Sequence, residues 1–188
     1  MFRSTKGEYG YINKRKYGQL GLAVLMGIIG LSIYGIGYIV NGFERNNICM
    51  VLGILMVLPG AKFLVTYILL FPYHTPNKEL YQETVKTLQG KQKLLSDLVI
   101  TSKERAMNLH FLYVGNGCVY GLLGREGTGV KEVQDYLTKG IRNWAGSYTV
   151  KIMDRETSFF KILHEIPEKE MNKEEEERVL AYIYSLIV

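Results

Sequence analysis

The sequence predicts an α+β protein in two parts, an N-terminal two-helix transmembrane hairpin and a small domain built on a mixed β-sheet. Two apolar runs, at about 18–40 and 48–71, are long enough to cross a membrane. Helical and strand patterns alternate after them, and the mean hydropathy of +0.02 is high for a soluble chain. We therefore divide the 188 residues into a basic tail at 1–17, the hairpin at 18–72 and an α/β domain at 73–188.

Charge is distributed unevenly along the chain, whose net charge is +5. Residues 1–17 carry five Lys or Arg and one Glu, whereas residues 73–188 carry 16 basic and 16 acidic side chains. The basic excess therefore belongs to a short membrane-flanking segment, and we expect no nucleic-acid partner. The domain is also too short for a large multidomain enzyme. Cys49 and Cys118 lie in different parts of the chain, which fits a reducing cytoplasm better than a disulfide.

The two apolar runs are predicted to form an antiparallel hairpin. Residues 18–40 contain no charge, and at ~1.5 Å per residue they cross a hydrocarbon core of about 30 Å. The polar segment at 41–47 is so short that the chain must reverse its direction there, which makes the two spans antiparallel. Lys and Arg concentrate on the outer flanks of the hairpin, so the positive-inside rule places both termini in the cytoplasm, below the inner membrane. We expect Lys14, Arg15 and Lys16 to contact anionic headgroups.

Small residues recur along one face of the first predicted span and twice in the second. They allow helix backbones to approach closely, either within the hairpin or between subunits of a homo-oligomer. These residues are Ala23, Gly27, Gly30, Gly37, Gly53 and Gly60. Lys62 is a charge inside the second span, and its long side chain is expected to reach the headgroups or to find a specific partner.

The domain begins with a predicted helix and three strands. Thr75 and Pro76 look like the N-cap and first residue of a helix that Gly90 ends. A strand is predicted at 94–101. Two more, at 107–114 and 118–123, flank a Gly-Asn-Gly hairpin turn.

The rest of the domain is predicted to alternate between helices and one strand. A glycine-rich loop at 124–129 leads into a helix that begins near Val130 and is closed by Gly146. A strand at 148–153 and a short helix at 158–165 follow. The last helix starts at a capping box on Asn172 and runs to the terminus.

This element order is shared by the core of restriction-endonuclease-like folds. Such nucleases hold a metal with an acid on the second strand and Glu-x-Lys on the third, but residues 118–123 contain neither an acid nor a lysine. We therefore predict no catalytic residue and no metal site. His74, His110 and His164 fall on different elements without paired ligand spacing, and His110 is interpreted as a packed or edge residue. No cofactor is expected.

The loop at 124–129 is the candidate ligand site. Backbone N–H groups at a helix start can hold a phosphate, and basic side chains flank this one. The predicted binding residues are Arg125, Gly127, Gly129 and Lys131. An ordinary strand-to-helix turn is the alternative interpretation.

The opening MFRSTKGEYGY and the LPGAK of the second span resemble an uncharacterised family of small two-span membrane proteins from anaerobic Gram-positive bacteria. The resemblance implies the same hairpin and one α/β domain along the whole chain. Some members carry the label of O-linked GlcNAc-transferase-like protein. The residues here do not support that label, because a glycosyltransferase needs a larger nucleotide-sugar fold and an acidic diphosphate site.

These observations lead to a hypothesis of a non-catalytic, membrane-anchored cytoplasmic interaction or adaptor module that binds a protein partner. One alternative is a sensor or enzyme for a phosphorylated ligand or nucleic acid at the inner membrane face. A second is a small homo-oligomeric membrane protein associated through its glycine-rich helices.

Overall fold

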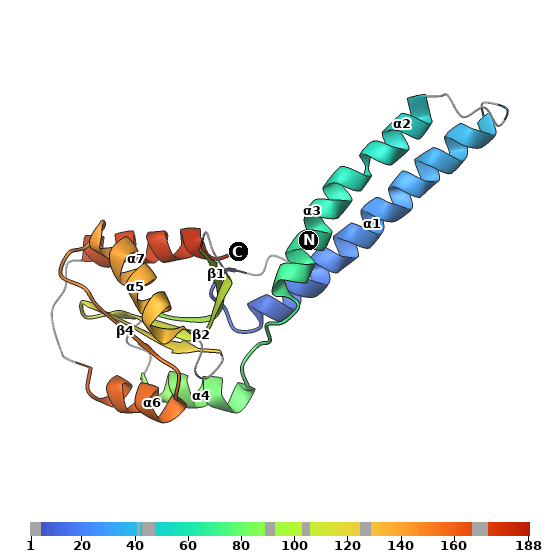
Figure 1. Ribbon diagram of the computed structural model, residues 1–188. Coiled ribbons are helices and arrows are strands. Elements are labelled where there is room, and N and C mark those ends of the chain that lie inside the picture. Colours follow the sequence, from blue (N-terminus) through green and yellow to red (C-terminus); the bar gives the residue numbers. More distant parts are fainter. Residues whose placement is uncertain are drawn as a thin grey trace. The chain divides into compact units, whose positions relative to one another are not determined.

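The computed structural model is an α+β protein in which helical and sheet parts form two compact units (Figure 1). It describes residues 5–40, 42, 48–88, 93–102, 106–124, 129–166 and 173–188. One unit comprises the apolar helices between residues 13 and 72. The other comprises the described residues of 73–188 together with residues 5–12.

The hairpin unit contains α1 (Tyr11–Val40), α2 (Ile48–Leu55) and α3 (Val57–Leu70). The stretches Tyr11–Val40 and Ile48–Leu70 are long and apolar enough to span a membrane, and only 11% of each apolar window is buried. The helices predicted at 18–40 and 48–71 are therefore confirmed, although α1 begins seven residues earlier than the charge-free run. The predicted turn at 41–47 falls largely outside the described residues.

The second span is interrupted at Met56, between α2 and α3. Proline at position 59 has no N–H to donate to the carbonyl four residues earlier, at Leu55, which is where α2 ends. The helical path continues across this break, because the N–H of Met56 donates to the carbonyl of Leu52 and the N–H of Gly60 donates to the carbonyl of Met56. The expected single helix is thus two helices with a local break, a correction that Pro59 explains.

The domain unit is a four-stranded mixed sheet with helices on both faces (Figure 1). The strand order is β1-β2-β3-β4, with antiparallel pairing from β1 to β3 and parallel pairing between β3 and β4. The hairpin turn between β2 and β3 has positive φ at Asn116 and Gly117, as predicted. In chain order the elements are α4 (Lys78–Thr87), β1 (Lys93–Thr101), β2 (Ala106–Gly115), β3 (Cys118–Leu123), α5 (Val130–Arg142), β4 (Thr149–Met153), α6 (Glu156–His164) and α7 (Lys173–Leu186).

Each face of the sheet has its own apolar core. Leu137 of α5 and Ile183 of α7 are fully buried against one face. Phe159 of α6 is fully buried against the other, where it stacks on Phe111 of β2. All six residues of β3 are buried, because this central strand is covered on both sides.

Several predicted helix boundaries are wrong by a few residues. The helix expected from Thr75 and Pro76 starts at Lys78 with Asn77 at the N-cap, because Thr75 turns its hydroxyl to another partner. The helix after the loop ends with Asn143 at its C-cap, three residues before Gly146. The short helix predicted at 158–165 begins at Glu156. Gly90 and the capping box at Asn172 lie outside the described residues.

Residues 5–12 pack on the domain, although they belong to the expected basic tail at 1–17. The carbonyl of Gly7 accepts the N–H of Ser96 in β1 at 2.8 Å, and Gly7 adopts φ +82°. Lys6 donates to the carbonyl of Ile187, and the Tyr11 hydroxyl donates to that of Val188. The opening segment and the C-terminus therefore cover the outer edge of β1, which would otherwise present unpaired backbone groups.

Candidate functional site

A polar cavity of about 520 Å³ opens on the α4 and α6 side of the domain. Its walls come from the linker that follows the hairpin, from α4, from the start of α6, from the middle of β2 and from Gly124, which follows β3. We call it the acidic pocket. The side chains that give it its chemistry are His74, Thr75, Glu79, Glu83, His110 and Glu156. The pocket therefore gathers three carboxylates and two imidazoles from elements that are distant in the sequence.

His110 enters the pocket from a bulge in β2. Leu109 pairs with Leu123 whereas Phe111 pairs with Leu122, so His110 is the extra residue on its strand. A bulge of this kind redirects a side chain, and bulges are frequent next to functional sites. Burial lowers the pKa of the His110 imidazole, so the ring is neutral at pH 7.

Gly124 keeps the space beside His110 open. A Cβ on this residue would collide with Nδ2 of Asn108 and would lie 3.0 Å from Nε2 of His110. Only a residue without a side chain leaves room here for both neighbours.

Asp97 lies in β1 at the register position across from His110. Ser96 pairs with Phe111 and Leu98 pairs with Leu109, while Asp97 itself has φ +56°, which is uncommon for a residue other than glycine. Its side chain is fully buried. The two neighbouring strands are thus both irregular at the same place in the sheet, beside the pocket.

The carboxylate of Asp97 joins the chain segments on either side of the hairpin. Oδ2 accepts the N–H of Gly10 at 2.7 Å and the hydroxyl of Thr75 at 2.9 Å. Burial raises the pKa of Asp97, and the hydrogen bonds from Thr75 and from the backbone of residues 10–12 oppose that shift. Thr75 also lines the acidic pocket, so this residue both binds Asp97 and borders the pocket.

Tyr9 makes a second connection between the same two segments. Its hydroxyl donates to the carbonyl of Pro76 at 3.0 Å, and its ring stacks on Tyr81 of α4 with centroids 4.6 Å apart. We call Tyr9, Gly10, Thr75, Pro76 and Asp97 the clasp. It holds the segment before the hairpin and the segment after it together on the domain.

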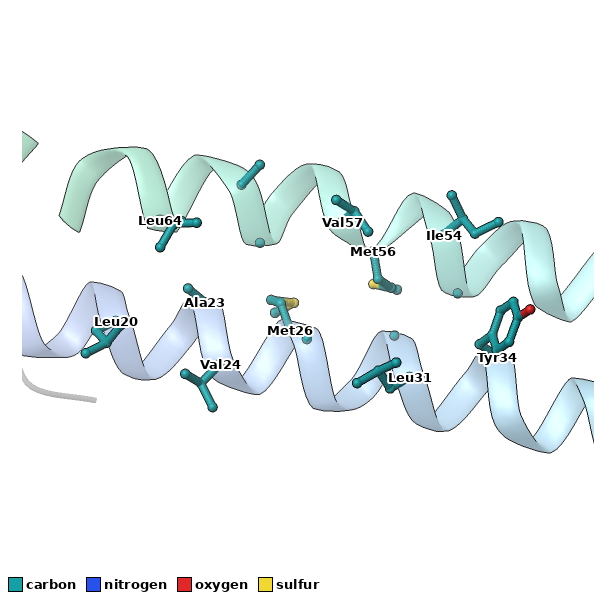
Figure 2. Close-up of a pocket in the computed structure, with 15 residues that line it drawn as sticks. Leu20, Ala23, Val24, Met26, Leu31, Tyr34, Ile54, Met56, Val57 and Leu64 are labelled. Carbon is teal, nitrogen blue, oxygen red and sulfur yellow. The ribbon is translucent and has the colours of Figure 1, made fainter. Parts of the chain in front are cut away.

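The small residues predicted to pack do so within the hairpin. A Cβ on Gly30 would lie 3.0 Å from the carbonyl oxygen of Gly53, and one on Gly53 would lie 2.9 Å from that of Gly30. Gly60 faces Met26 and Ala23. Figure 2 shows an apolar groove between α1 and the two helices of the second span, α2 and α3. Met26 and Met56 lie between α1 and the second span. The intrahairpin interpretation therefore accounts for Gly30, Gly53, Gly60 and Ala23.

Gly27 and Gly37 differ from that group. Gly27 lines the groove, but nothing lies within 4 Å of the position its Cβ would take. Gly37 is buried. Packing between subunits through Gly27 stays a prediction.

The basic residues assigned to headgroups have different surroundings. Lys16 is only 4% exposed and donates to the carbonyl of Phe71, the C-cap of α3, at 3.2 Å. A cation at this position stabilises the unpaired carbonyls at the helix end. Lys14 and Lys62 are exposed and Arg15 is half-buried, so headgroup contact by these residues stays a prediction.

The predicted phosphate site is only partly described. Gly129 is the N-cap of α5 with φ +63°, and Lys131 is exposed in its first turn. Arg125 and Gly127 lie outside the described residues. Neither Gly129 nor Lys131 lines the acidic pocket, whose carboxylates would repel a phosphate.

The sequence alone does not indicate that His74 and His110 share one pocket, or that Asp97 binds Thr75 at its edge. His74 and His110 are 36 positions apart and show no motif, and only the fold brings them together. Asp97 left a weak signal, since it is a carboxylate inside an otherwise apolar strand pattern. Among the described residues no three His, Cys, Asp or Glu side chains are grouped closely enough to hold a metal ion. No family model, curated protein or solved structure matches the chain.

Proposed function

We propose that this protein is a membrane-anchored interaction module, in which the hairpin spans the cytoplasmic membrane and the domain binds a protein partner on the cytoplasmic side. The supporting observation is the exposure of the apolar helices. Leu31, Val40 and Ile48 are each more than 70% exposed, in helices whose apolar windows are almost unburied. A helix of a soluble core buries such side chains, whereas a membrane helix presents them to lipid.

The clasp supports an anchoring role for the hairpin. The chain leaves the domain after Gly10 and returns to it before Thr75, and both residues bind the same carboxylate oxygen of Asp97. The domain is therefore attached to the hairpin at two points of the chain, one before the hairpin in sequence and one after it. This double attachment is consistent with a domain anchored through both ends of the hairpin.

The orientation can be tested by labelling an introduced cysteine with a membrane-impermeant thiol reagent. Cys118 cannot report topology, because its thiol is buried in the domain. Lys173→Cys in a Cys49→Ser background places an exposed thiol at the start of α7. We expect labelling after the cells are permeabilised and none in intact cells. Labelling of intact cells would reverse the proposed topology.

The partner can be sought by crosslinking in membranes with the full-length protein and a chimera. The chimera replaces residues 18–70 by an unrelated two-helix hairpin and keeps residues 1–17, since the domain needs Gly10 to satisfy Asp97. A partner captured by both proteins would support recognition by the domain. A partner lost in the chimera would move recognition to the hairpin. Capture of the protein alone in repeated experiments would argue against the adaptor role.

The proposal extends to the domain's fold. The order α4-β1-β2-β3-α5-β4 supports a restriction-endonuclease-like core, consistent with the order expected from the sequence. β2 and β3 contain no Asp, Glu or Lys, so the proposal includes no nuclease activity.

A further inference from the structure

The lining of the acidic pocket consists mainly of hydrogen-bond acceptors. The carboxylates of Glu79, Glu83 and Glu156 carry negative charge, and the neutral imidazole of His110 offers one unprotonated nitrogen. No Lys or Arg belongs to the described lining. Since residues 73–188 have equal numbers of acidic and basic side chains, this is a local concentration of negative charge.

The pocket also has the dimensions of a ligand site. Its volume of about 520 Å³ lies within the range that small-molecule sites occupy, roughly 300–1,000 Å³. The bulge at His110 and the missing side chain at Gly124 keep its inner end open.

Helix stabilisation explains only part of this arrangement. Glu79 and Glu156 lie in the first turns of α4 and α6, where a carboxylate interacts favourably with the helix dipole. Glu83 lies in a later turn of α4, and the two imidazoles come from the linker and from β2. The helix dipoles therefore do not explain why these five groups line one cavity.

We propose that the acidic pocket binds a ligand that carries an ammonium or guanidinium group. Carboxylates provide charge-assisted hydrogen bonds to such a cation, and a neutral imidazole adds an acceptor at the inner end. The cation can be a free polyamine or the side chain of a basic residue in another protein, and both present the same chemistry. This inference does not depend on the partner or the topology proposed above.

The test measures binding to the full-length protein in nanodiscs of zwitterionic lipid, which do not themselves attract cations. The probes are spermidine and an acetylated tri-lysine amide. The binding of each is measured by isothermal titration calorimetry. The triple variant Glu79→Gln, Glu83→Gln, Glu156→Gln removes the charges of three exposed side chains. We expect it to bind about tenfold more weakly or worse, as loss of charge-assisted bonds predicts. The matched control is Glu165→Gln, Glu174→Gln, Glu177→Gln, which neutralises three exposed glutamates elsewhere and should bind as wild type does.

The two probes distinguish the sources of the cation. Binding of spermidine alone supports a free amine, and binding of the peptide alone supports a basic protein segment. Failure of both probes to bind at millimolar concentration would overturn the proposal. Equal weakening by the two triple variants would overturn it as well, because the attraction would then be unspecific.

Discussion

The clasp makes a quantitative prediction for Asp97→Ala. Alanine removes the oxygen that accepts from Gly10 and Thr75, and it leaves these two donors in a site whose native side chain is fully buried. A buried donor without a partner costs about 1–3 kcal/mol, so the pair costs roughly 2–6 kcal/mol. Alanine at φ +56° adds about 1 kcal/mol of backbone strain. Removal of the buried negative charge offsets part of this cost. We therefore expect the free energy of unfolding to fall by about 2–5 kcal/mol.

Asp97→Asn is the matched control for that prediction. Asparagine keeps an acceptor oxygen, and it tolerates the left-handed backbone that Asp97 adopts. We therefore expect a loss of about 1 kcal/mol or less. The assay is denaturant unfolding of the full-length protein in micelles, with hydrogen exchange at Gly10 as a local probe. Equal stability of the Ala and Asn variants, with unchanged exchange at Gly10, would refute the role assigned to the carboxylate.

Three further predictions follow from other contacts. Gly53→Ala should destabilise the hairpin by about 1–3 kcal/mol in thermal unfolding in micelles, because its Cβ would lie 2.9 Å from the Gly30 carbonyl oxygen, whereas Gly27→Ala, with open space around it, should not. The folded-state pKa of Asp97 is raised, so its stabilising contribution is complete below the ordinary pKa of about 3.9 and is lost as pH rises through the folded value. Wild type should therefore gain stability relative to Asp97→Asn on acidification from pH 7, and a constant difference would contradict this. Gly140→Ala should loosen the packing of α7 on α5, since its Cβ would collide with the Tyr182 hydroxyl, and Gly146→Ala is the silent control in the same unfolding assay.

The elements themselves were accessible to sequence reasoning because each depends on local patterns. The apolar run at 118–123 predicts a strand with the observed bounds, and Gly115-Asn-Gly117 predicts the tight turn before it. The uncharged runs predict both apolar helices. Boundaries were less accessible, as Thr75 shows, because a residue that can cap a helix can also bind a distant carboxylate.

The sequence by itself determined the two apolar helices, the mixed α+β domain and the small residues that let Gly30 and Gly53 meet. Only the tertiary structure decided that Lys16 binds Phe71, that Asp97 joins Gly10 to Thr75, and that His74 and His110 share an acidic pocket. The physical reason is the range of the interactions. Periodicity and turn preference act over a few neighbouring residues, whereas the Gly10 N–H and the Asp97 carboxylate are 87 positions apart and meet only when the sheet has formed.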